Sequence, residues 1–133
     1  GVELGVEKRL HFIGKPAKME LEGKIDYRSL VRKLTKLHAD DTLFQRGGNL
    51  LFVDSFNEAI IDALRLDPET GSPRYLVCAN FDTQKEQKVD LHLQALAGST
   101  LKGLLGEESL RLDDAILQIV MKPGGVRVYR IDS

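Results

Sequence analysis

The sequence has little of two residue types that often show how a small protein is held together or what it binds. Among its 133 residues there is one cysteine, Cys78, and no tryptophan. One cysteine excludes an internal disulfide, and its place within an apolar run predicts a small buried side chain rather than a reactive thiol. Sugar rings commonly stack on tryptophan or tyrosine, and the three tyrosines here, Tyr27, Tyr75 and Tyr129, lie in apolar patterns typical of a core.

An excess of either charge is also missing. The chain carries 19 Lys and Arg against 20 Asp and Glu, a formal net charge of -1, and no segment concentrates basic residues. Nucleic-acid binding requires a basic stripe, so we expect no nucleic-acid partner. No apolar run approaches the ~18 residues of a membrane span, and the first residues do not open a secretion signal, so we expect no membrane partner. The sequence indicates no compartment.

The first sharp pattern begins at Asp26, which is a good helix N-cap. Apolar residues follow at helical spacing, and basic residues occupy the other face. The apolar positions are Tyr27, Leu30, Val31, Leu34 and Leu37. This pattern predicts an amphipathic helix of about three turns that ends near residues 38–41. Because it has one apolar stripe, the helix needs a partner surface to cover that stripe.

Beyond Gly47 the hydrophobic period changes to two, which is typical of strands. We predict strands over residues 50–53, 59–66, 75–79, 89–93, 101–105, 110–112, 115–121 and 126–131. The last two flank Lys122-Pro-Gly-Gly125, which predicts a terminal hairpin. The expected fold class is mainly β: an antiparallel Greek-key β-sandwich of seven to eight strands preceded by one amphipathic α-helix.

No combination of side chains typical of catalysis or metal binding is visible. The adjacent acidic pairs are interpreted as solvated turns, because neighbouring side chains on an extended chain point in opposite directions. The histidines lack metal-ligand spacing, the serines lack a nucleophile-elbow context, and neither glycine pair joins a strand to a helix. These residues are Asp40-Asp41 and Asp113-Asp114; His11, His38 and His92; Ser55, Ser72 and Ser99; and Gly47-Gly48 and Gly124-Gly125. We therefore predict no catalytic, cofactor-binding or metal-binding residues and no cofactor, and we expect His92 to be exposed on a strand.

The segment RYLVCANFD, residues 74–82, ends a continuous apolar run on Asn80 and Phe81. The run predicts a central strand buried between two sheets. An asparagine amide bonds readily to the backbone where a strand ends. We therefore interpret Asn80 as a strand terminator rather than a catalytic or sugar-binding residue, and expect Phe81 to fill the edge of the sandwich.

Six segments occur in an order that carries a family resemblance. They are GVELG at residues 1–5, DYRSLVRKLTKL at 26–37, LR at 64–65, YLVCANF at 75–81, LKGLLGE at 101–107 and PGG at 123–125. Their order and spacing resemble the C-terminal end of alpha-amylase family glycoside hydrolases, from the segment after the eighth barrel strand to the final hairpin. Three residues depart from the family pattern. Asp41 stands where proline is frequent, Asp62 interrupts a strand, and Ala63 replaces a common aromatic.

The resemblance implies that residues 1–46 are the end of a (β/α)8 barrel, including its last helix, and that residues 47–133 are the C-terminal β-sandwich domain. It implies that the catalytic carboxylates lie on earlier barrel strands, outside this sequence. By resemblance, the chain is a non-catalytic domain of a glycosidase or transglycosidase acting on α-glucans, and it packs on and stabilises the catalytic barrel.

The sequence also leaves an alternative function and predicts a contact for the helix. The alternative function is an autonomous carbohydrate-binding module for α-glucans. Without a barrel to cover it, the stripe of Leu30, Val31, Leu34 and Leu37 is expected to fold back on the sandwich or to mediate a homodimer.

Overall fold

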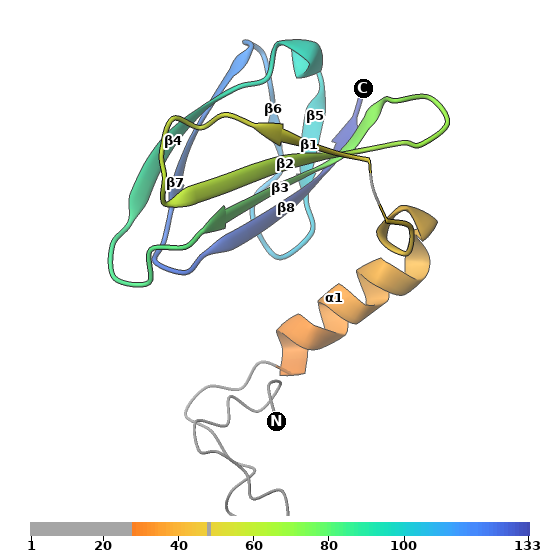
Figure 1. The fold of residues 1–133 in the computed structure, drawn as a ribbon, viewed down its shortest axis with the longest axis horizontal. Helices are drawn as coiled ribbons and strands as arrows, with labels where there is room; N and C mark the ends of the chain where they lie inside the picture. Colours follow the sequence, from red (N-terminus) through yellow and green to blue (C-terminus); the bar gives the residue numbers. More distant parts are fainter. Residues whose placement is uncertain (1–27, 48) are drawn as a thin grey trace, which may run out of the picture. The chain divides into compact units, whose positions relative to one another are not determined.

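The structure is a computed structural model that describes residues 28–47 and 49–133. The chain divides into two compact units, Gly1–Arg46 and Gly47–Ser133. In the described part of the first unit there is one α-helix, and the second unit is built of strands (Figure 1). Among the described residues, no helix is long and apolar enough to cross a membrane.

Helix α1, Arg28–Asp40, is amphipathic as its spacing predicts. The apolar side chains of Leu30, Val31 and Leu34 are 40%, 36% and 42% exposed. The stripe is therefore largely open to solvent, and only Leu37 reaches intermediate burial. The expected N-cap Asp26 and the stripe residue Tyr27 lie outside the described residues.

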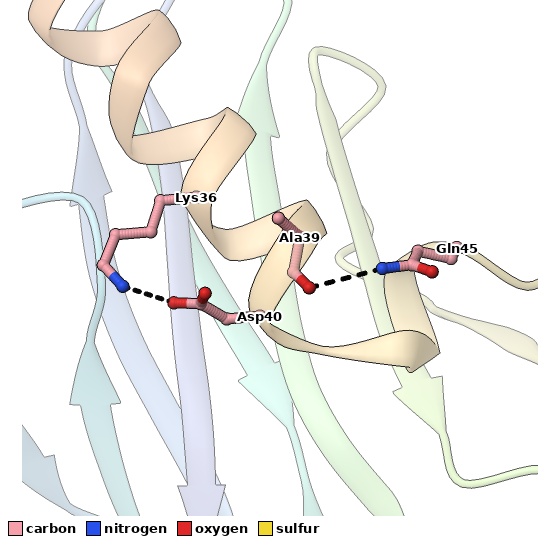
Figure 2. Close-up of polar contacts among 4 residues, drawn as sticks. All are labelled: Lys36, Ala39, Asp40 and Gln45. Atoms are coloured by element: carbon pink, nitrogen blue, oxygen red, sulfur yellow. Dashed lines mark hydrogen bonds and ion pairs between the residues drawn. The ribbon is translucent and has the colours of Figure 1, made fainter.

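The C-terminal end of α1 is closed by side chains (Figure 2). Lys36 forms an ion pair with Asp40 one turn later, an exposed contact that stabilises a helix by only a few tenths of a kcal/mol, about 0.3–0.5. The amide of Gln45 donates to the carbonyls of His38 (3.0 Å) and Ala39 (3.4 Å), which have no partner further along the helix. Asp41 starts the short 3-10 helix η3, Thr42–Phe44, by accepting from the Leu43 N–H. Both residues of the Asp40-Asp41 pair therefore stabilise the end of the helix and the turn that follows it.

Eight strands make up the second unit, and every pair of neighbours is antiparallel. A six-stranded sheet has the order β1-β2-β3-β8-β5-β6, and a two-stranded sheet consists of β4 and β7. The bounds are β1 Leu50–Val53, β2 Ile60–Leu66, β3 Pro73–Asn80, β4 Gln87–His92, β5 Thr100–Gly103, β6 Leu110–Arg111, β7 Ile116–Met121 and β8 Val126–Asp132, with a second 3-10 helix, η4, at Gln94–Leu96. The predicted mainly β fold with a preceding helix is confirmed.

The pairings nest inside one another. Strand β5 pairs with β6, β4 with β7, and β3 with β8, so the chain folds back on itself as one long ribbon wrapped across two sheets. Nested antiparallel pairing of this kind is the connectivity of Greek-key sandwiches and jelly rolls. Strand β3 lies between β2 and β8 in the large sheet (Figure 1), as the continuous apolar run of residues 75–79 predicts.

The predicted terminal hairpin is wrong. Strand β7 pairs with β4 in the small sheet, whereas β8 pairs with β3 and β5 in the large one. Lys122-Pro-Gly-Gly125 is nevertheless a tight turn, in which the Gly125 N–H donates to the Lys122 carbonyl and Gly124 has a φ of 62°. The turn therefore carries the chain from one sheet to the other instead of joining two neighbours.

The core lies between the inner faces of the two sheets. Its largest fully buried apolar side chains come from both: Leu76, Leu101 and Tyr129 from the large sheet, and Leu91 and Met121 from the small one. Cys78 has no exposed surface and lies in this core. Burial raises the pKa of its thiol far above the usual range, which removes the thiolate needed for reactivity. The predicted burial of Cys78 and of Tyr75 and Tyr129 is confirmed.

Asn80 joins three segments at one end of the sandwich. Its amide nitrogen lies 3.1 Å from the Lys85 carbonyl in the β3–β4 connection, 3.3 Å from the carbonyl of Met121 at the end of β7, and 3.0 Å from that of Lys122 in the β7–β8 connection. Its amide oxygen accepts from the Asp82 N–H at 2.9 Å. Asn80 is buried, so its role as a backbone-bonding strand terminator is confirmed. Phe81 does not fill the sandwich edge as expected, because its side chain is 66% exposed.

We predict that Asn80→Ala lowers the free energy of unfolding by about 2–3 kcal/mol, since several hydrogen bonds are lost and buried carbonyls are left without a donor. Asn80→Asp keeps the acceptor for Asp82 but loses the donor to the three carbonyls, so it is expected to be no more stable than the alanine variant. Urea unfolding monitored by circular dichroism measures both. A loss below about 0.5 kcal/mol for the alanine variant would show that these bonds do not hold the two connections together.

Candidate functional site

The outer face of the small sheet presents an ordered array of side chains. Residues 88, 90 and 92 of β4 alternate with buried Val89 and Leu91, and residues 116, 118 and 120 of β7 alternate in the same way. The register places Lys88 opposite Val120, Asp90 opposite Gln118, and His92 opposite Ile116. The predicted exposure of His92 on a strand is confirmed. The β4 row is thus polar throughout, and the β7 row has Gln118 between two apolar residues, so the Asp90–Gln118 pair lies at the centre.

The loop between β1 and β2 borders this array and is held by its own side chains. Asp54 accepts from the Phe56 N–H at 2.8 Å, and Asn57 accepts from the Ala59 N–H at 3.0 Å. The Asn57 amide also donates to Gln87 (3.1 Å) and to the Lys88 carbonyl (3.3 Å), which ties the loop to β4. Asx turns of this kind fix a loop without burying apolar surface.

Phe56 stands at the tip of this loop in an unusual state. Its φ is 52°, in the left-handed region that disfavours a bulky side chain, and its ring is 82% exposed. The ring meets His92 edge to face, with centroids 6.4 Å apart and an interplanar angle of 87°. Neither the core nor the backbone gives a reason for phenylalanine at this position.

Together the loop and the small sheet form an open groove of about 1010 Å³. Ligand sites commonly measure about 300–1,000 Å³. The groove offers an aromatic pair, the amide of Gln118, the carboxylates of Glu58 and Asp90, and the ammonium of Lys88. These groups suit hydrogen bonding and stacking. The hydroxyl of Ser55, also in the groove, donates to the carbonyls of Asn57 and Ile60, so it is committed to the loop rather than to a catalytic base.

The structure does not assemble the other side chains singled out in the sequence into a site. Asp113 and Asp114 are exposed between β6 and β7, where Asp113 pairs with Arg111. His38 lies on α1, and His11 falls outside the described residues. In the described part of the chain, no group of three or more His, Cys, Asp or Glu side chains can hold a metal ion.

Asp62 is the one described residue whose buried side-chain oxygens lack a hydrogen-bond partner. It lies on the inner face of β2, opposite Val53 of β1 and Cys78 of β3. Burial raises the pKa of the Asp62 carboxyl, and the neighbouring Cys78 thiol offsets part of that shift. The side chain is 1% exposed, so the carboxylate is closed to solvent. This departure from the family pattern therefore places an unpaired acid in the core.

We predict that Asp62→Asn is more stable than the wild type at pH 7 by about 1–3 kcal/mol, because the neutral amide avoids the desolvation that burial imposes on an ionised carboxylate. Because the folded-state pKa is raised, the folded protein binds the proton more tightly than the unfolded chain. The associated stability is present below the unfolded-state pKa of about 3.9 and is lost as pH rises through the folded-state value. The difference between variant and wild type should therefore grow from pH 4 to pH 7.

Urea unfolding at both pH values measures this difference, with Asp114→Asn as a matched exposed control. A stability difference that is the same at pH 4 and pH 7, or an Asn variant that is less stable at both, would contradict the assignment.

The leucine-rich segment 101–107 is structural. A Cβ on Gly103 would lie 2.1 Å from the Glu107 backbone carbonyl, so only glycine fits there. The Glu107 carboxylate accepts from the Leu105 N–H (3.0 Å) and from the Val128 N–H of β8 (2.7 Å), and Gly106 has a φ of 111°. The motif closes a turn and bonds it to the neighbouring strand.

Sequence reasoning missed Phe56. The available signal was an aromatic within the turn-prone segment Asp54-Ser-Phe-Asn57, where no apolar period includes it. This sequence context indicates that the Phe56 ring is exposed, but it does not indicate which residues lie beside the ring. The pairing of β4 with β7, which puts His92, Asp90 and Gln118 beside the loop, is a long-range feature.

The fold of this chain matches part of a solved glycoside hydrolase. One such match is an Anoxybacillus alpha-amylase, whose crystal structure is described as providing insights into a new glycosyl hydrolase subclass. The two share 20% sequence identity with a TM-score of 0.64, over 90% of this chain and 26% of the amylase chain. The sequence matches no protein-family model and no curated protein.

This likeness confirms, at the level of the fold, the resemblance drawn from the order of the six sequence segments. The chain is similar in fold to part of an alpha-amylase family glycoside hydrolase. It spans about a quarter of the length of that amylase, so the likeness concerns a mainly β part and not the whole enzyme.

Proposed function

We propose that this chain is the non-catalytic C-terminal domain of an alpha-amylase-like glycoside hydrolase acting on α-glucans, where it packs on and stabilises the catalytic barrel. The observation that carries the proposal is the fold match, which covers 90% of this chain but 26% of the amylase. In this proposal residues 1–46 are the end of the barrel and residues 47–133 are the C-terminal domain.

The outer face of the large sheet supports packing on a barrel. The register aligns Phe52 of β1 with Ala63, Val77 and Val128, and aligns Ile61 of β2 with Ala79 and Val126. Phe52 is 69% exposed, and Leu50, Ile61 and Val126 are about half exposed. We call this set, Leu50, Phe52, Ile61 and Val126, the outer apolar patch. Apolar surface gathered on one face marks an interaction site.

Two properties make a barrel the fitting occupant of the outer apolar patch. The patch has residues on β1, β2 and β8 and so extends across four neighbouring strands, and the outer helices of a barrel present a similarly broad surface. In the proposed parent, the domain follows the barrel directly along the chain, which keeps the two surfaces at high effective concentration.

We predict that the reading frame upstream encodes a barrel of roughly 250 residues or more, and that the longer protein depends on the outer apolar patch. Phe52→Asp in the longer protein should lower its melting temperature and its yield of active enzyme, because the charge is desolvated at the domain contact. Ile116→Asp, on the outer face of the small sheet, is the matched control and should leave both unchanged.

Thermal melts and amylase assays on the two purified variants make this comparison. Equal effects of Phe52→Asp and Ile116→Asp would contradict packing through the patch, and an upstream sequence without a barrel would contradict the proposed function itself.

The stripe on α1 gives a second test on the isolated chain. In the parent, barrel elements would cover Leu30, Val31 and Leu34, whereas here these side chains are exposed. We predict that the chain associates into a homodimer through this stripe at high concentration, and that Leu34→Asp abolishes the association. Light scattering over a concentration series measures it, with Lys33→Asp on the polar face as the control. A wild type that stays monomeric at all concentrations would show that the stripe does not mediate self-association.

A further inference from the structure

The groove between the β1–β2 loop and the small sheet is lined by none of the four residues of the outer apolar patch, although its Phe56 also borders a smaller hollow with Phe52 and Ile61. It opens on the outer face of β4 and β7, whereas the outer apolar patch lies on the large sheet. Its chemistry is also different, because polar and apolar groups share its surface.

Phe56 is held outward by a rigid loop. Three hydrogen bonds fix the backbone on both sides of it. The Phe56 N–H donates to Asp54, the Ala59 N–H donates to Asn57, and the Asn57 amide donates to a backbone carbonyl of β4. A non-glycine residue in the left-handed region typically carries about 1–2 kcal/mol of strain. An exposed aromatic ring gains little from the core to offset that strain. A strained backbone that carries an exposed ring indicates a binding role for that ring.

A polar pair in the groove, Asp90 and Gln118, is suited to bind paired hydroxyl groups. The Asp90 carboxylate and the Gln118 amide are register partners on adjacent strands, so their side chains lie side by side on one face. Each has a planar end group that can bond two neighbouring hydroxyls at once, the carboxylate as an acceptor and the amide as donor and acceptor. Phe56 and His92 supply two rings that line the same groove as this polar pair.

The charges of the groove disfavour anionic ligands. Lys88 is the one Lys or Arg that lines it, against the carboxylates of Glu58 and Asp90. A phosphate or a nucleic-acid strand would meet net negative charge, while a neutral ligand would not. A neutral ligand with a flat apolar face and a rim of hydroxyls matches both the rings and the polar pair.

We propose that this groove is a carbohydrate-binding site, in which a pyranose ring stacks on Phe56 and its hydroxyls bond to Asp90 and Gln118. The choice of an α-glucan among neutral carbohydrates rests on the proposed function; the site itself does not. In an amylase-like parent, such a site holds polymeric substrate at the domain surface, away from the barrel, and raises the concentration of chains near the enzyme.

The test is a titration of the isotopically labelled full chain with maltoheptaose, with cellohexaose as a second probe, followed by amide chemical shifts. The expected result is saturable shifts centred on Phe56, Asp90 and Gln118 with maltoheptaose. Shifts that saturate elsewhere in the chain, or no shifts with either sugar, would overturn the site.

Variants separate stacking from loop structure. Phe56→Gly removes the ring while glycine accepts the left-handed backbone, so the protein should keep or gain stability and lose binding by roughly three- to tenfold. Phe56→Trp retains a ring and should retain binding. Phe81→Ala removes a comparably exposed phenylalanine outside the groove and should bind like the wild type. Unchanged affinity in Phe56→Gly would contradict the role of the ring.

The outcomes also distinguish this inference from the proposed function. Equal binding of cellohexaose and maltoheptaose at Phe56 supports the carbohydrate site and counts against its α-glucan selectivity. Binding at Phe56 in a chain whose upstream sequence encodes no barrel supports the site while the proposed function fails. An upstream barrel together with no sugar binding leaves the proposed function in place and overturns the site.

Discussion

The β-sandwich depends on one buried amide. Two connections, β3–β4 and β7–β8, carry the chain between the large and the small sheet at the same end of the fold. Asn80 bonds to backbone carbonyls in both. The Asp82 carboxylate then completes the first connection by accepting from the N–H groups of Gln84 and Lys85, which hold its pKa below the usual range. The Asn80 N–H also donates to Gly125, and the Gly124 N–H donates to the Asp82 carbonyl, so the two turns are joined directly.

This junction determines what the small sheet can do. A two-stranded sheet is not stable alone and needs a hydrophobic face packed on other elements. Leu91 and Met121 supply that face from β4 and β7, and their strands enter and leave through the turns that Asn80 joins. Arg127 adds a second link between the sheets, since its guanidinium donates from β8 to the Val120 carbonyl of β7 at 2.7 Å. With its inner face committed to the core, the outer face of the sheet is left for polar side chains and a ligand.

Local patterns predicted the strands well because period-two alternation records burial directly. Val89 and Leu91 alternate with Asp90 and His92, and the structure has a strand there with the expected residues buried. The same patterns failed at Lys122-Pro-Gly-Gly125, because a tight turn has the same local sequence whether it joins neighbours in one sheet or crosses between two. The difference lies in the long-range pairing of β7 with β4 and of β8 with β3, which the sequence of the turn itself does not indicate. The groove escaped prediction for the same reason, since β4 and β7 meet only through the nested ribbon.

Two residues in this domain, Asp62 and Phe56, are unfavourable where they stand. One is buried and the other is exposed, and we interpret them differently for that reason. Asp62 puts a carboxyl group without a hydrogen-bond partner into the core, closed to solvent, and is expected to lower stability. Phe56 puts a large ring into a left-handed turn, open to solvent and beside an ordered row of polar groups. Glycine would relieve the strain at Phe56 and asparagine is the other residue that tolerates such a backbone, so neither stability nor solubility favours phenylalanine. What the aromatic ring of Phe56 provides is a flat apolar face that lines the groove, and that is the property a sugar ring uses.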